Sequence, residues 1–129
     1  MRTVLSSIES EMRRYQRLGD GSLRQLDAEA LTRLPPGDGN SVAAIVWHIA
    51  GNLRSRFTDF LTTDGEKPWR DRESEFAARP VSAAEVRAKW EDGWGVLLRT
   101  LGTLSDADLG RTVVIRGQSL SVLEALHRR

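Results

Sequence analysis

Apolar residues recur at helical spacing along most of the chain, and this pattern predicts four helical segments. The first covers about residues 2–18, and its apolar face consists of Val4, Leu5, Ile8, Met12 and Tyr15. The sequence GDG at 19–21 is expected to end this helix, because glycine interrupts helical patterns. A shorter helix is expected over 22–34, before Pro35-Pro36.

A second long helix is predicted over about 41–62, with Asn40 or Ser41 as its N-cap. The apolar face of this helix consists of Val42, Ile45, Val46, Ile49, Leu53, Phe57, Phe60 and Leu61. Gly65 and Pro68 then interrupt the pattern and begin a charged loop. We expect this loop to connect the second and third long helices.

The third long helix has a clear start signal in SAAE at 82–85, which is a capping box. It is predicted to run to about residue 103. Its inward positions are Val86, Trp90, Trp94, Leu97, Leu98, Leu101 and Leu104. Trp90 and Trp94 are one helical turn apart and are expected in the core, where each indole N–H needs a hydrogen-bond partner.

The C-terminal part is less regular. Residues 104–109 are expected to form a turn, and 111–121 a short strand or extended segment. A last helix is predicted from Ser121, which leaves it only nine residues before the chain ends at Arg129. Bundle helices are usually longer, so we expect either a genuinely short last helix or a chain that lacks its C-terminal part, and we favour the second. The predicted class is all-α.

Composition fits one domain that spans all 129 residues. The chain has 19 basic and 18 acidic residues and no dense basic cluster, so no nucleic-acid partner is expected. It has no cysteine, which excludes disulfides and thiolate metal ligands. The segment MRTVLSSIESEMRRY is too charged for a signal peptide, and no apolar run is long enough to span a membrane. We therefore expect a cytoplasmic protein without a membrane partner.

His48 stands out in the second long helix, because the chain has only one other histidine, His127. On a helical wheel it lies on the flank of the apolar face, next to a polar edge formed by Asn52, Ser55 and Asp59. Such an edge is commonest as an ordinary solvent boundary. A histidine that faces the space between helices is also how bundles build metal sites. A metal site needs about three protein ligands, so both interpretations stay open.

The charged loop offers weaker candidates. Asp64 and Glu66 could bind a hard cation, although two carboxylates at this spacing are a weak signal. Trp69 and Phe76 are expected to pin the loop to the bundle, with its charges paired at the surface. Alternatively, the loop is a lid over a pocket beside the second long helix. Neither a Gly-x-Ser-x-Gly elbow nor a phosphate-binding loop occurs.

Two stretches resemble the DinB-like superfamily. They are NSVAAIVWHIAGNLRSRFTDFLTTDGEKPWRDRESEF at 40–76 and VIRGQSLSVLEALHRR at 114–129. The resemblance implies an up-down-down-up four-helix bundle, with most of the last helix missing from this chain, and commonly a homodimer. Members of the superfamily include bacillithiol transferases and mycothiol-dependent maleylpyruvate isomerase.

The resemblance also implies a divalent metal, such as Zn²⁺ or Ni²⁺, held by three histidines. His48 matches the ligand from the second helix. The other two would lie in an HxxxHxGQ-like stretch beyond Arg129, and His127 falls upstream of that pair. Asn52 and Arg56 are candidates to orient a substrate or a metal-bound group.

Two functional hypotheses follow from this resemblance. The first is a metal-dependent hydrolase or thiol S-transferase, in which the ion activates a water or a thiol to attack a small-molecule substrate. The second is a non-catalytic helical homodimer or interaction module, because an incomplete bundle would expose an apolar patch that drives association.

Overall fold

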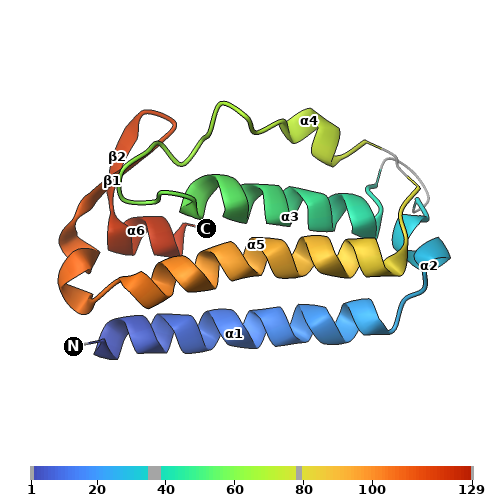
Figure 1. Ribbon diagram of the computed structural model, residues 1–129, viewed down its shortest axis with the longest axis horizontal. Helices are drawn as coiled ribbons and strands as arrows, with labels where there is room; N and C mark the ends of the chain where they lie inside the picture. Colours follow the sequence, from blue (N-terminus) through green and yellow to red (C-terminus); the bar gives the residue numbers. More distant parts are fainter. Residues whose placement is uncertain (1, 35–38, 78–79, 129) are drawn as a thin grey trace.

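Three long helices form the body of the molecule. The computed structural model describes residues 2–34, 39–77 and 80–128. The long helices are α1 (Thr3–Arg24), α3 (Val42–Phe57) and α5 (Ala83–Thr103), and α5 packs against both of the others. Figure 1 shows the three running side by side, with α5 between α1 and α3. Three short helices complete the helical part: α2 (Ala28–Thr32), α4 (Arg72–Glu75) and α6 (Val122–His127).

A β-hairpin adds a small sheet that the all-α prediction lacked. A 3₁₀ helix, η1 (Asp106–Gly110), leads into the antiparallel strands β1 (Thr112–Ile115) and β2 (Gln118–Ser121). Arg116 and Gly117 form the turn with φ of +52° and +75°, as a two-residue hairpin turn requires. The predicted extended segment is thus confirmed, and the predicted all-α class holds in the coarser sense of a mostly helical protein with one small sheet. The protein is mostly helical, and the described residues include three long helices and no fourth one.

The first helix is longer than its sequence pattern predicts. It continues through the GDG sequence to Arg24, so the predicted stop at 19–21 was wrong. Asp20 accepts a hydrogen bond from the indole Nε1 of Trp90 at 2.7 Å, and a Cβ at Gly19 would overlap the ring of Trp90. Contact with α5 therefore keeps this stretch helical, and the predicted helix over 22–34 is reduced to α2, which Asp27 caps.

The second long helix is shorter than predicted. Ser41 caps α3 as expected, accepting a hydrogen bond from the backbone N–H of Ala44. The helix ends at Phe57 and not at residue 62, because Thr58 is extended and Asp59 has a φ of +47°. Small residues bring this helix close to α5, where a Cβ on Gly93 would lie 2.8 Å from Cα of Ala50.

The capping box predicted at Ser82–Glu85 forms at the start of α5. The structure adds a second one, Ser121–Glu124, at the start of α6. Trp90 and Trp94 are both 8% exposed, which confirms their place in the core. The N–H of Trp94 has no hydrogen-bond partner among the described residues. The main core members are Leu5, Met12, Leu31, Val46, Phe57, Val86, Leu97, Leu101, Val122 and Leu126.

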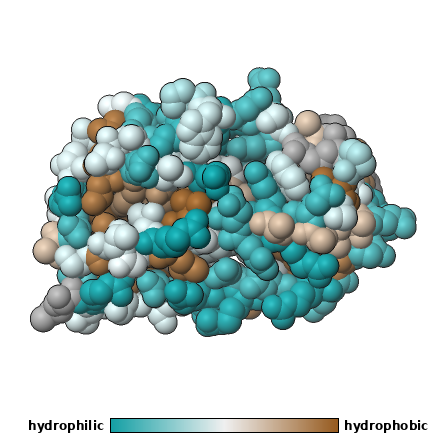
Figure 2. Space-filling view, viewed as in Figure 1, coloured by the Kyte–Doolittle hydropathy of each residue, from teal (hydrophilic) through white to brown (hydrophobic). Residues whose placement is uncertain are grey.

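The surface is largely hydrophilic. In the view of Figure 2, hydrophobic residues gather in one patch toward the end of the molecule that holds α6 and the hairpin. Across 2–34, 39–77 and 80–128, no helix combines the length and the apolar character needed to cross a membrane.

Candidate functional site

A cavity of about 350 Å³ opens beside the C-terminal half of α3. Its walls come from α3, from the loop before α4, from the β-hairpin and from the end of the described chain. The lining residues are His48, Asn52, Arg56, Arg70, Arg72, Ile115, Arg116, Gln118, Leu120 and Arg128. Residues far apart in the sequence therefore share one small-molecule-sized space.

His48 is held in this wall by a buried carboxylate. Its ring Nδ1 lies 3.1 Å from Oε1 of Glu75, whose side chain is only 8% exposed. An ionised carboxylate can only accept a hydrogen bond, so Nδ1 is the donor in this contact, and in the neutral form of the ring Nε2 then keeps its lone pair. Nε2 has no hydrogen-bond partner in the part of the chain that the structure describes. The ring of Phe76 lies 4.9 Å from the imidazole and also limits its orientation.

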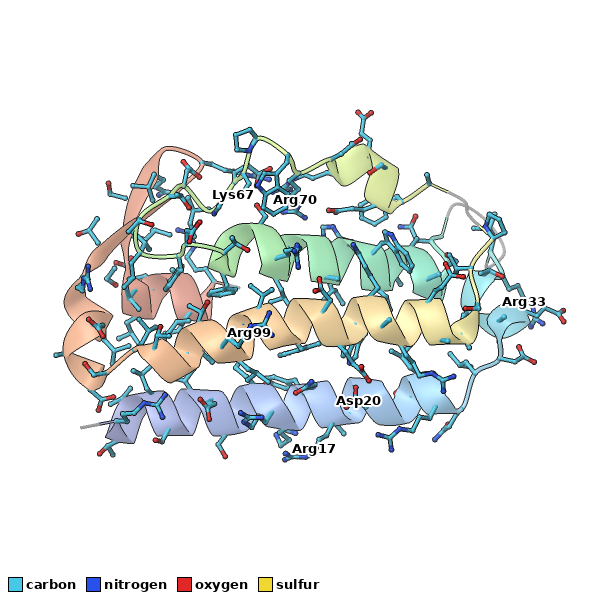
Figure 3. The ribbon with its side chains drawn as sticks, in the orientation of Figure 1. Arg17, Asp20, Arg33, Lys67, Arg70 and Arg99 are labelled. Atoms are coloured by element: carbon cyan, nitrogen blue, oxygen red, sulfur yellow. The ribbon has the colours of Figure 1, made fainter. Side chains whose placement is uncertain are left out.

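Arg70 fixes the carboxylate in turn. Its Nε and Nη2 donate to the two oxygens of Glu75 at 3.1 and 3.2 Å. The Arg70 side chain is 3% exposed, and Figure 3 shows it between the loop and α3. Two parallel hydrogen bonds fix both the distance and the orientation of the Glu75 carboxylate relative to Arg70. Glu75 is therefore a rigid support for the imidazole of His48.

A glycine makes room for this arrangement on the surface of α3. A Cβ at Gly51 would overlap Oε2 of Glu75, so only glycine lets the carboxylate approach the helix. Gly51 and His48 are one turn apart on α3, which puts the carboxylate within reach of the ring.

The cavity also concentrates positive charge. Arg72 pairs with Glu66 through two hydrogen bonds of 3.0 Å, and Arg116 lies 3.7 Å from the same carboxylate. Arg56 donates to the backbone carbonyl of Arg128 at 2.9 Å. Burial, followed by the charges of Arg70, Arg128 and Arg72, lowers the pKa of Arg56.

One family matches the whole chain. The family described as "Protein of unknown function (DUF1572)" covers residues 1–129. The chain belongs to the DUF1572 family. A search of curated proteins found no match.

In this DUF1572 chain, three of the polar residues predicted beside the second long helix meet at the cavity. His48, Asn52 and Arg56 all line it. Ser55 does not, because it is fully buried behind them. Asp59 lies beyond the end of α3 and does not line the cavity either.

Ser55 instead belongs to a buried polar contact with the loop. Its Oγ donates to the carbonyl of Gly65 at 2.6 Å and accepts from the backbone N–H of Lys67 at 3.0 Å. The Lys67 ammonium donates to the carbonyls of Ser55 and Asp64, both at 2.6 Å. Burial lowers the pKa of Lys67. This lysine satisfies one carbonyl near the end of α3 and one in the loop, and so holds the loop in place, a role that the sequence did not suggest.

Asp64 and Glu66, the carboxylates that the sequence offered as cation ligands, form other interactions in the structure. Asp64 accepts hydrogen bonds of 2.8 Å from the backbone N–H groups of Glu66, Arg116 and Gly117. The N–H groups of Glu66 and Gly117 lower the pKa of Asp64. Glu66 faces guanidinium groups, as described above. The Asp64–Glu66 pair therefore joins the loop to the hairpin, and its geometry does not favour a hard-cation site.

Sequence reasoning missed Glu75 and Arg70 as site residues. It placed them among surface charges of the loop, whereas both side chains are buried. Phe76 packs against His48, but Trp69 is 55% exposed, so the expectation that both aromatic residues pin the loop holds only for Phe76. Arg70 and Arg72 line the cavity, so the loop borders a pocket beside α3, and its interpretation as a lid stays a prediction.

Proposed function

We propose that this DUF1572 protein is a metal-binding protein of the DinB-like kind and that His48 is one of its ligands. The observation that carries the proposal is the chain of contacts from Arg70 through Glu75 to His48. A carboxylate that accepts the proton of one ring nitrogen is the usual support for a histidine whose other nitrogen binds a metal. Imidazole suits several divalent ions, of which Zn²⁺ and Ni²⁺ are our candidates.

The described residues supply one ligand of the proposed set. They contain no group of three or more histidine, cysteine, aspartate or glutamate side chains arranged to hold an ion. The resemblance assigns the two remaining ligands to residues beyond Arg129. Arg128 lines the same cavity as His48, so the end of the described chain lies beside the imidazole.

The proposed chemistry is a hydrolase or a thiol S-transferase reaction on a small molecule. A divalent ion would supply Lewis acidity, which lowers the pKa of a bound water or thiol. The protein's own part is to present Nε2 of His48 in the cavity and to orient the substrate. Asn52 and Arg56 lie on the same wall as His48 and offer an amide and a guanidinium for that purpose.

Replacement of His48 by alanine is expected to abolish metal binding, because it removes the ligand that Glu75 orients. The measurement is metal content by mass spectrometry of the full gene product after dialysis against Zn²⁺ or Ni²⁺. We expect about one ion per chain in the unaltered protein and almost none in His48→Ala.

His127→Ala is the matched control, because His127 lies in a different hollow beside Ile8 and Met12. It should bind as much metal as the unaltered protein. A folded full gene product that takes up no ion, or a His48→Ala variant that keeps its ion, would contradict the proposal.

A homodimer is the second candidate, and exposed apolar residues on α1 favour it. Val4 is 45%, Tyr15 39% and Leu18 59% exposed. Spacings of eleven and three residues place them on one side of the helix. Such a stripe fits a second copy of the same helix, since two identical apolar stripes can bury each other around a two-fold axis.

Leu18→Glu is expected to convert the proposed dimer into a monomer, because it replaces the most exposed apolar side chain of the stripe with a charge. Light scattering after size-exclusion chromatography measures the mass. Leu34→Glu is the control, because Leu34 is equally accessible at 64% exposure but lies outside α1, and it should leave the mass unchanged. A monomeric unaltered protein at high concentration would rule out this candidate.

A further inference from the structure

Five guanidinium groups line the cavity beside His48, and two carboxylates balance only part of their charge. The five belong to Arg56, Arg70, Arg72, Arg116 and Arg128. Glu75 pairs with Arg70, and Glu66 is shared by Arg72, Arg116 and, at 3.7 Å, Arg70. Five guanidinium groups against two carboxylates leave an excess of about three positive charges. The cavity therefore has a strongly positive potential in a chain whose net charge is only +1.

Two of these arginines have no carboxylate within ion-pair distance among the described residues, although Glu66 acts on Arg56 and Glu124 interacts with Arg128 from further away. Arg56 is partly buried, and its side chain donates to the carbonyl of Arg128. Arg128 forms no ion pair in that part of the chain and lies exposed at the rim. Like charges close together and partly removed from water are costly, and an anion between them lowers that cost.

The other lining residues indicate what accompanies the negative charge. Asn52 and Gln118 offer amide groups that donate or accept hydrogen bonds, whereas Ile115 and Leu120 supply an apolar surface. A volume of about 350 Å³ is within the range of small-molecule sites. A cavity with both positively charged and apolar walls suits an organic molecule with one strongly anionic end better than a bare inorganic ion.

We propose that this cavity binds a small organic anion whose phosphate or carboxylate oxygens lie between Arg56 and Arg128. Guanidinium groups form paired hydrogen bonds with such oxygens. Arg70 and Arg72 keep their carboxylate partners and add to the positive electrostatic potential of the cavity. The apolar part of the ligand contacts Ile115 and Leu120. This inference goes beyond metal binding and does not depend on it. Together with that proposal, it would name the substrate class of the same cavity.

The test is isothermal titration calorimetry at low ionic strength, on protein that has been stripped of metal with EDTA and then dialysed free of it, because EDTA is itself an organic polycarboxylate. Phenyl phosphate and phthalate carry the same apolar ring with a phosphate or two carboxylates, and benzyl alcohol is the uncharged probe. We expect at least one of the two anions to bind, with an affinity that falls as salt rises, and benzyl alcohol not to bind. Which of the two binds more tightly assigns the anionic group.

Arg56→Gln and Arg128→Gln are each expected to weaken binding about tenfold or more. Arg128 is exposed, so its variant remains informative if Arg56→Gln does not fold. Arg54→Gln is the matched control, because Arg54 is on the same helix but pairs with Asp92 away from the cavity, and the Kd of this variant for the anion should not change.

The proposal is wrong if the folded protein binds neither anion, if benzyl alcohol binds equally well, or if both cavity variants bind as the unaltered protein does. Because the protein is metal-free in this test, none of these results bears on metal binding by His48.

Discussion

Replacement of Glu75 by alanine is expected to lower the free energy of unfolding by about 3–5 kcal/mol. The side chain of Arg70 is 3% exposed and that of Glu75 8%, so the change leaves a buried guanidinium with only its longer contact to Glu66, at 3.7 Å. Removing one partner of a buried pair costs more than the pair contributes, because the remaining charge cannot regain water. Urea denaturation followed by circular dichroism measures the loss.

Two further variants separate this explanation from a general effect of lost contacts. Asp92→Ala removes an ion pair with Arg54 whose side chains are 48% and 44% exposed, and it should cost less than about 1 kcal/mol. The double variant Arg70→Met with Glu75→Leu removes both charges and should be clearly more stable than Glu75→Ala. Equal losses for Glu75→Ala and Asp92→Ala would contradict the buried-pair account.

Replacement of Gly93 by leucine is expected to destabilise the protein by about 2–4 kcal/mol, because it separates α3 from α5. A Cβ at this position would lie 2.8 Å from the backbone Cα and 3.1 Å from the Cβ of Ala50. Neither atom belongs to a flexible side chain, so the clash can be relieved only by a shift of the helices. Thermal unfolding and urea denaturation both report the change.

Gly102→Leu is the matched control on the same helix. Nothing lies within 4 Å of a Cβ placed at Gly102, so the substitution gains helix propensity without a clash. It should stabilise the protein by up to about 1 kcal/mol. If Gly93→Leu had the same effect as Gly102→Leu, the close approach of α3 and α5 would be refuted.

Features decided by neighbouring residues could be predicted from the sequence. The capping box at Ser82–Glu85 and the start of α6 after Ser121 involve residues three positions apart, and both form as the local pattern indicates. The ends of α1 and α3 could not be predicted in this way. The first depends on the contact of Asp20 with Trp90, seventy residues later, and the second is stabilised by Lys67 through a loop. Tertiary contacts of this kind override local propensity.

The difference between local patterns and tertiary contacts also explains which site residues the sequence identified and which it missed. His48 could be identified because histidine is rare here and stands on the flank of an apolar face. Glu75 lies 27 residues further along, in a segment without periodicity, so no spacing connects it to His48. Arg70 looked like an ordinary loop charge, since burial of a charged side chain is a property of the fold and leaves no mark in composition.

Gly51 gives the contact between His48 and Glu75 a sequence signature that can be sought in related proteins. Its missing side chain is the space that Oε2 of Glu75 occupies. A related protein with any larger residue at the equivalent place would have to give up this carboxylate or move it. Among DUF1572 sequences, glycine three positions after the histidine should therefore occur together with the acidic residue, and a chain that has lost one should tolerate loss of the other.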